Sequence, residues 1–241
     1  MNVNVVYPVP LDAWDTFRPH VAEFCRTWQE FPPGAPCTLV CVCRGGLPQG
    51  DQLSPFIPLG NVRFVPYDGN GFDIGAHQYF AFQAGDAFNV NVSTRVFFHR
   101  PGWLAKLLES RHYFGPGLFG TAVSVETGVL HFRTHCYGID APVFRRYPDL
   151  INSRERTFEF EHARNNHPRG SFLQWAMNQG DLAAACVYWD GGWRPSEWFN
   201  RPNIWRKGDE SNLLVFDHHT RSFLNSPPGV RDFLSRATGT L

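Results

Sequence analysis

The 241-residue sequence has no long apolar run and no excess of charge, and each absence excludes a class of protein. No stretch approaches the roughly 18 consecutive apolar residues of a membrane-spanning helix, so we expect no transmembrane segment. The 22 basic and 22 acidic residues cancel at neutral pH, which argues against binding of nucleic acid by bulk attraction to phosphate. The first ten residues have no basic region followed by an apolar run, so we expect no signal peptide and a cytoplasmic location.

The sequence also has no CxxC pair, although it contains six cysteines. Cys41 and Cys43 are two residues apart in a strand-like run, so they share one face of that strand. A metal cluster of Cys37, Cys41 and Cys43 would need a spacing that is not present. Small buried thiols are the favoured interpretation.

The first half of the sequence alternates strand-like and helix-like segments, which predicts an α/β fold with a mostly parallel sheet flanked by helices. The helix after the first strand contains Pro19, so it either starts late, near Thr16, or kinks there. The expected strands are Val3 to Tyr7, Cys37 to Cys43, Val62 to Tyr67 and Asp86 to Val92. The expected helices are Trp14 to Trp28, a segment starting near Asp73, and one that opens at Pro101.

The second half is less regular, but no internal repeat divides it from the first, so we expect a single domain. Val129 to Tyr137 predicts one strand, with His131, Arg133 and His135 on the same face. Further strands are expected at Leu118 to Val125, Leu182 to Trp189 and Leu213 to Phe216, with helical segments at Pro142 to Tyr147, Phe158 to His162 and Ser171 to Gly180.

Polar clusters follow two of the strands, at Asp68 to Asp73 and at Asn91 to Arg95. In an open α/β sheet, ligands bind at the carboxyl ends of the strands. We therefore expect the functional site at these two clusters.

Four segments, taken in order, resemble a glycosyltransferase of the GT-A fold, nearest the inverting enzymes of polysaccharide and cell-wall synthesis. The segments are Val5-Val6-Tyr7-Pro8, Asn70-Gly71-Phe72, Phe88 to Leu104, and Phe158 to Trp189. Together they cover most of residues 3–190. The resemblance implies a single GT-A-like (Rossmann-like) domain, with a nucleotide-sugar-binding half at 1–110 and an acceptor-side half at 111–241.

The resemblance also implies partners and site residues. The donor would be a nucleotide-sugar and the acceptor a glycan or a lipid-linked molecule, with Glu161 as the base that deprotonates the acceptor hydroxyl and Glu159 as its rival. The donor-side candidates are Tyr7, Pro8, Arg44, Asp68, Asn70, Gly71, Asp73, Ser93 and Thr94. The acceptor-side candidates are His131, Arg133, Thr134 and His162.

One departure from the family concerns the metal. The Asp-x-Asp motif that grips the donor diphosphate is replaced by Asn91-Val92-Ser93-Thr94-Arg95, which has no carboxylate. Hydroxyls and amides hold a divalent cation weakly, so manganese or magnesium is a possible cofactor that lacks its usual ligands. A guanidinium can stabilise a leaving diphosphate instead, and Arg95, with Arg133 or Arg44, is the candidate. We do not expect a metal role for His218-His219.

Each candidate also has a purely structural explanation. Arg95 could be a solvated loop residue, Asp73 a helix cap, and Glu161 an ordinary first-turn carboxylate. The alternative function is a non-catalytic nucleotide- or glycan-binding protein of the same fold. A third, nucleotidyl transfer, usually has a Gly-rich basic loop after the first strand, and Val9-Pro10-Leu11 is not one.

Overall fold

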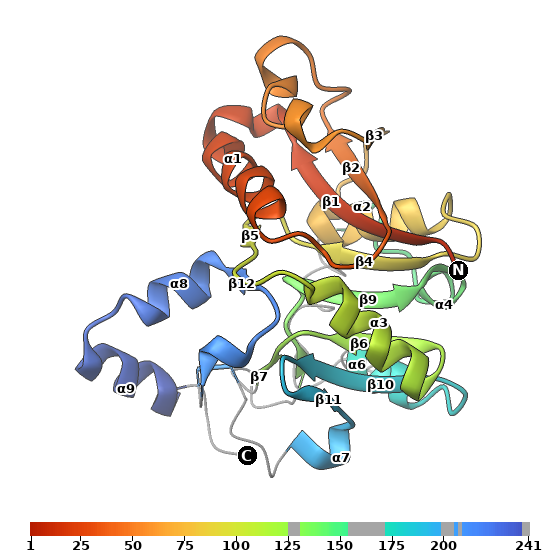
Figure 1. Ribbon diagram of the computed structural model, residues 1–241. Helices are drawn as coiled ribbons and strands as arrows, with labels where there is room; N and C mark the ends of the chain where they lie inside the picture. Colours follow the sequence, from red (N-terminus) through yellow and green to blue (C-terminus); the bar gives the residue numbers. More distant parts are fainter. Residues whose placement is uncertain (125–130, 154–171, 199–204, 207–208, 238–241) are drawn as a thin grey trace.

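An eight-stranded sheet forms the centre of the protein (Figure 1). The computed structural model describes residues 1–124, 131–153, 172–198, 205–206 and 209–237. The strand order is β11-β10-β6-β9-β4-β1-β2-β3. The strands are β1 Val3–Pro10, β2 Thr38–Arg44, β3 Val62–Tyr67, β4 Phe88–Val92, β6 Gly117–Gly120, β9 Cys136–Asp140, β10 Ala183–Tyr188 and β11 Gly191–Trp193.

The sheet is mostly parallel, which confirms the predicted fold class. Strand β1 pairs in parallel with both β2 and β4, so that Val6 lies between Val40 and Asn91. Among the described strands of this central sheet, only β9 and β11 run antiparallel to their neighbours. Strands β1, β2, β3 and β4 therefore present their carboxyl ends at the same edge of the sheet.

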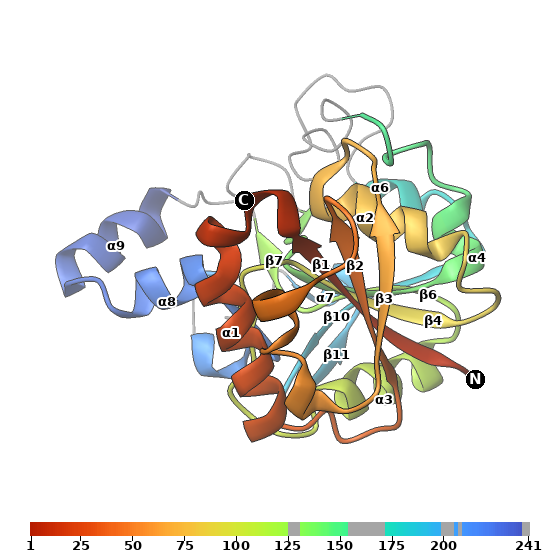
Figure 2. The ribbon, with the colours of Figure 1, turned by 90° about the horizontal axis from the view of Figure 1, so that it is seen from above.

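Helices cover both faces of the sheet (Figure 2). Alternation along β1 explains the two layers: Val5 and Tyr7 pack with Phe24 of α1, whereas Val6 packs with Phe80 of α2. The helices are α1 Trp14–Glu30, α2 Phe72–Ala81, α3 Trp103–Phe114, α4 Ala141–Arg145, α6 Phe172–Met177, α7 Pro195–Trp198, α8 His218–Leu224 and α9 Pro228–Ala237. None of these described helices is both long and apolar enough to cross a membrane.

Two helix starts differ from the predictions. Helix α1 begins at Trp14 and contains Pro19, so a late start near Thr16 is wrong. Pro19 lies in the second turn, where its missing N–H removes only one bond of the helix. Helix α3 begins at Trp103, because Gly102 adopts a left-handed backbone (φ 86°) at its N-cap and leaves Pro101 outside.

The predicted strand Val129 to Tyr137 is wrong, since the chain turns in its middle. Residues His131–Phe132 form β8, which pairs with β7 (Val123–Ser124) in a separate two-stranded sheet, and β9 starts only at Cys136. Between β8 and β9 the chain leaves β7 and begins to pair with the end of β4: the Ser93 N–H donates to the carbonyl of His135 at 2.8 Å. The common strand face expected for His131, Arg133 and His135 therefore does not exist.

The C-terminal segment also differs. The predicted strand Leu213 to Phe216 is replaced by β12 (Phe216–Asp217), which pairs antiparallel with β5 (Val96–Phe97) outside the central sheet. Helices α8 and α9 follow and project beside α1 (Figures 1 and 2). This pairing brings the residues after Phe216 next to the end of β4.

Candidate functional site

A cavity of about 620 Å³ lies at the carboxyl end of β4, and we call it the main cavity. A smaller pocket of about 70 Å³, the side pocket, adjoins it and shares Phe17, Phe72 and Asp73. The main cavity is lined by Phe17, Phe72, Asp73, Ser93, Thr94, Arg95, His131, Arg133, Thr134, His135, Trp205, Arg206, Asp217, His218 and His219. The side pocket is lined by Pro8, Val9, Pro10, Phe17, Val42, Arg44, Tyr67, Phe72, Asp73 and Ala76.

Asp73 and Thr94 line one side of the main cavity, and together with Tyr7 and Pro8, which contact Thr94, they form what we call the N-terminal wall. Asp73, in the first turn of α2, accepts hydrogen bonds from Thr94 with both oxygens, from the backbone N–H at 3.0 Å and from the hydroxyl at 3.1 Å. The same hydroxyl lies 3.3 Å from the carbonyl of Pro8, and the Tyr7 hydroxyl donates to the carbonyl of Thr94 at 3.0 Å. Burial raises the pKa of Asp73, and the hydrogen bonds from Thr94 oppose that shift. The wall therefore fixes the turn that follows β4.

Arg95 lies on that turn and faces the C-terminal segment. Its guanidinium is 5.3 Å from the ring centre of Phe17, and its Nη1 is 3.1 Å from Nε2 of His218. Because a guanidinium only donates hydrogen bonds, Nε2 of His218 is the acceptor and carries no proton. Burial and the neighbouring His219 and Arg95 lower the pKa of His218 to about 4, which is consistent with a neutral ring.

The opposite side, the C-terminal wall, consists of Arg133, His135, Trp205 and Asp217. Arg133 donates to Asp217 at 2.7 Å and lies 3.4 Å from the ring centre of Trp205. Burial alone would raise the pKa of Asp217, but Arg133 and His135 hold it well below its usual range. Burial lowers the pKa of His135 to about 4.

Asp217 also begins α8, where it accepts from the N–H of Thr220 at 2.8 Å and from its hydroxyl at 2.9 Å. This is a helix cap made by the same carboxylate that pairs with Arg133. One residue thus joins the C-terminal helix to the turn between β8 and β9.

No family model and no curated protein matches the chain. Among solved structures, residues 1–349 of S. aureus TarS are similar over 99% of this chain and 70% of that one, with 9% identity and a TM-score of 0.51. A galactosyltransferase, LgtC, in complex with donor and acceptor sugar analogues, is similar over 76% and 73%, with 13% identity and a TM-score of 0.51. The chain has a GT-A-type fold. A putative glucose-1-phosphate thymidylyltransferase from Bacillus anthracis has the same TM-score of 0.51 over 79% and 88%, with 12% identity.

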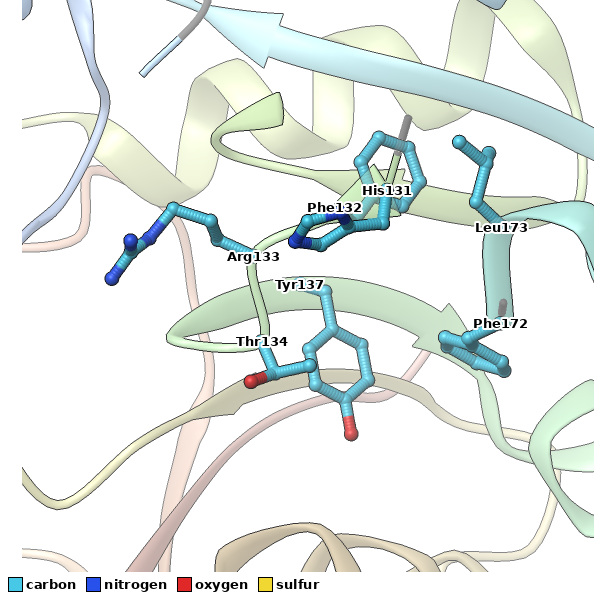
Figure 3. Close-up of a pocket in the computed structure, with 7 residues that line it drawn as sticks. All are labelled: His131, Phe132, Arg133, Thr134, Tyr137, Phe172 and Leu173. Carbon is cyan, nitrogen blue, oxygen red and sulfur yellow. The ribbon is translucent and has the colours of Figure 1, made fainter. Parts of the chain in front are cut away.

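Within this GT-A-type fold, the structure brings many of the predicted residues together. Ser93, Thr94 and Arg95 meet the acceptor-side candidates His131, Arg133 and Thr134 around the main cavity. Figure 3 shows His131 in β8 and Arg133 and Thr134 between β8 and β9, with Arg133 extending away from Phe172 and Leu173.

Other predicted residues lie elsewhere. Asp68 and Asn70 are exposed and line neither cavity. Gly71 packs against the backbone of Leu150 and Ile151, where a Cβ atom would lie 1.9 Å from the Leu150 carbonyl oxygen. Packing therefore leaves no room for a side chain at position 71. The candidates Glu159, Glu161 and His162 lie outside the described residues.

Arg44 lines the side pocket, where it pairs with Asp12 at 2.8 Å. Phe17 and Asp217 also line the main cavity, and no site role was predicted for either. Asp217 follows an expected strand and comes directly before His218-His219. This position was the one feature of the sequence that could have indicated a site role for Asp217.

The described residues around the turn do not fit the divalent cation that a GT-A fold suggests. No group of three His, Cys, Asp or Glu residues within the described part of the chain is arranged to hold a metal ion. Both oxygens of Asp73 accept from Thr94, and Asp217 is paired with Arg133. Arg95 adds a positive charge where a cation would need a carboxylate.

Proposed function

We propose that this protein is a glycosyltransferase that transfers a sugar from a nucleotide-sugar donor to a glycan or a lipid-linked acceptor. The observation that carries the proposal is the main cavity, which opens at the carboxyl end of β4 and contains Arg95. Ligands of open α/β sheets bind at this edge. A guanidinium there suits phosphate, because it forks onto two oxygens and stays charged.

The two cavities suggest how the donor lies. Aromatic and apolar residues, among them Phe17, Tyr67 and Phe72, line the side pocket, and they suit the flat face of a nucleobase. The diphosphate would then pass Thr94 and reach Arg95, and the sugar would point toward His131 and Thr134 in the main cavity.

The reaction breaks the bond between the anomeric carbon and the diphosphate oxygen, and the electron pair stays on that oxygen. In our proposal Arg95 stabilises the growing negative charge without a metal. Attack by the acceptor hydroxyl from the opposite face inverts the anomeric centre, and Glu161 is the proposed base. These finer assignments rest on the family resemblance and on the charge of Arg95.

Turnover of UDP-, GDP- and ADP-linked sugars, with and without chelator, tests the proposal. We expect donor hydrolysis in chelator, and we expect Arg95→Ala to reduce the rate by about 10²–10³, the usual effect of removing one transition-state donor. Arg26→Ala is the matched control, since Arg26 is an exposed arginine on α1, and it should leave the rate unchanged.

Other outcomes would replace the proposal. Strict dependence on manganese or magnesium would contradict the metal-free mechanism. Binding of nucleotides with no turnover of any donor would favour the non-catalytic alternative. Formation of a nucleotide-sugar from a nucleoside triphosphate and a sugar phosphate would identify a nucleotidyltransferase.

A further inference from the structure

We propose that His218 takes up a proton when a diphosphate binds and becomes, beside Arg95, the second cation of the site. This inference rests on the proposed function, because it concerns the same diphosphate. It assigns to a residue of helix α8 a direct role in holding the leaving group.

The geometry gives His218 two states. In the protein without ligand, Nε2 of His218 accepts from Nη1 of Arg95 at 3.1 Å. A phosphate oxygen that binds the guanidinium competes for the same Nη1–H, because an anion is a stronger acceptor than a neutral imidazole. Nε2 is then released next to the phosphate, where it can bind a proton from solvent and donate it in a hydrogen bond.

Burial, together with the groups around His218, keeps the ring neutral before binding. Arg95 faces it from the turn after β4, and His20 faces it from α1 with ring centres 6.3 Å apart. His219, on α8, lies 3.8 Å away between ring centres.

Two further charged groups near His218 are already in ion pairs: Asp217, the N-cap of α8, with Arg133, and Arg221 of α8 with Glu23 of α1. Burial is the largest cause of the lowered pKa of His218, about 4; His219, Arg95 and His20 lower it further, and Asp217 opposes them. A bound anion favours the protonated ring.

Charge counting supports the role. The diphosphate of a nucleotide-sugar carries two negative charges, and a single arginine neutralises one. Protonated His218 supplies the other, so that Arg95 and His218 together carry the double charge of a divalent cation. When the sugar bond breaks, the leaving oxygen gains a further negative charge, and the His218 N–H can stabilise it.

Titration calorimetry with UDP, GDP and ADP in chelator measures the proton directly. The observed heat at pH 7 differs between PIPES and imidazole buffers by the number of protons taken up, multiplied by the difference between the ionisation enthalpies of the two buffers. We expect about 0.5–1 proton per nucleotide for the wild type, since an adjacent dianion can raise a histidine pKa by several units. His218→Gln should lose that uptake while its amide oxygen still accepts from Arg95.

Affinity should fall by up to about tenfold from pH 7 to pH 8 in the wild type, because one proton of uptake changes the binding constant tenfold per pH unit. We expect less than about a twofold fall in His218→Gln. The matched control is His112→Gln, an exposed histidine on α3, which should behave as the wild type.

The outcomes separate the two proposals. Equal proton uptake in the wild type and His218→Gln, with nucleotide still bound, overturns this inference and leaves the proposed function. Failure of all three nucleotides to bind overturns both. If His218→Gln does not fold, long-range ¹⁵N–¹H spectra of the wild-type histidines decide: one neutral ring must become cationic on addition of nucleotide, and unchanged rings overturn the inference.

Discussion

The two walls of the main cavity are held in place by different interactions. In the N-terminal wall, Thr94 and Asp73 are joined by hydrogen bonds between segments that already belong to the central sheet or to the helix α2 beside it. In the C-terminal wall, the ion pair between Arg133 and Asp217 joins segments outside that sheet. Strand β12, which carries Asp217, has only two residues paired with β5.

This difference shows what each wall requires. The turn after β4 inherits its position from a strand paired along its length with β1 and β9. The segment at β12 has few backbone bonds to position it, so buried charges and the contact between Arg133 and Trp205 hold it. The C-terminal wall should therefore be more sensitive to loss of a single charge.

The largest effect should come from Asp217→Asn, which keeps the shape of the side chain and removes its charge. We expect a loss of about 3–5 kcal/mol in the free energy of unfolding, because the change breaks a buried ion pair by removing one partner. Urea denaturation measures it.

The matched control for this substitution is Asp181→Asn. Asp181 pairs with Arg146 on the surface at 3.3 Å. Its loss should cost less than about 1 kcal/mol. Equal losses for the two variants would contradict the difference between the walls.

Acid should weaken the end of β4 and the C-terminal wall through buried neutral histidines. His77, which contacts the Val92 carbonyl at 3.1 Å, has a pKa lowered by burial to about 3, and His135 has one lowered to about 4. Between pH 6.5 and about 4 the unfolded chain binds protons at these positions and the folded protein does not. The free energy of unfolding therefore falls as the pH falls, by roughly 2 kcal/mol per histidine from pH 7 to pH 5.

Urea denaturation of the wild type, His77→Gln and His135→Gln at pH 7 and pH 5 measures how much each histidine contributes to the pH dependence of the free energy of unfolding. Removal of either histidine should reduce the pH dependence by a similar amount. A pH dependence that is unchanged in both variants would show that neither histidine is held neutral.

The smallest effect should come from Thr94→Val in the N-terminal wall. Valine keeps the shape and the backbone N–H, but it removes the hydroxyl that contacts Asp73 and Pro8. We expect a loss of about 1–3 kcal/mol, the cost of leaving a buried acceptor unsatisfied. Ser93→Ala, one residue earlier on the same turn, should change the thermal stability by less than about 0.5 kcal/mol. A larger loss in Thr94→Val than in Asp217→Asn would reverse the comparison.

Local patterns in the sequence predicted the first half of the fold well. Strand β3 has the predicted bounds of Val62–Tyr67. Strand β4 leads into the polar turn as expected, although it begins at Phe88 and not at Asp86. Both strands are rich in apolar residues and are bounded by turn residues, so their length and type are encoded locally. The prediction was wrong at Val129 to Tyr137, because the change of partner at His135 depends on Ser93, a residue far away in the sequence.

The candidate site divides in the same way. The sequence by itself determined that residues 91–95 contain no carboxylate and one arginine, and that this segment follows a strand. Only the tertiary structure decided that Arg95 meets His218, 123 residues later, and that Arg133 meets Asp217, 84 residues later. The reason is physical: residue type and periodicity determine local conformation, whereas contacts between distant side chains depend on how the helices pack on the sheet and where its strands end.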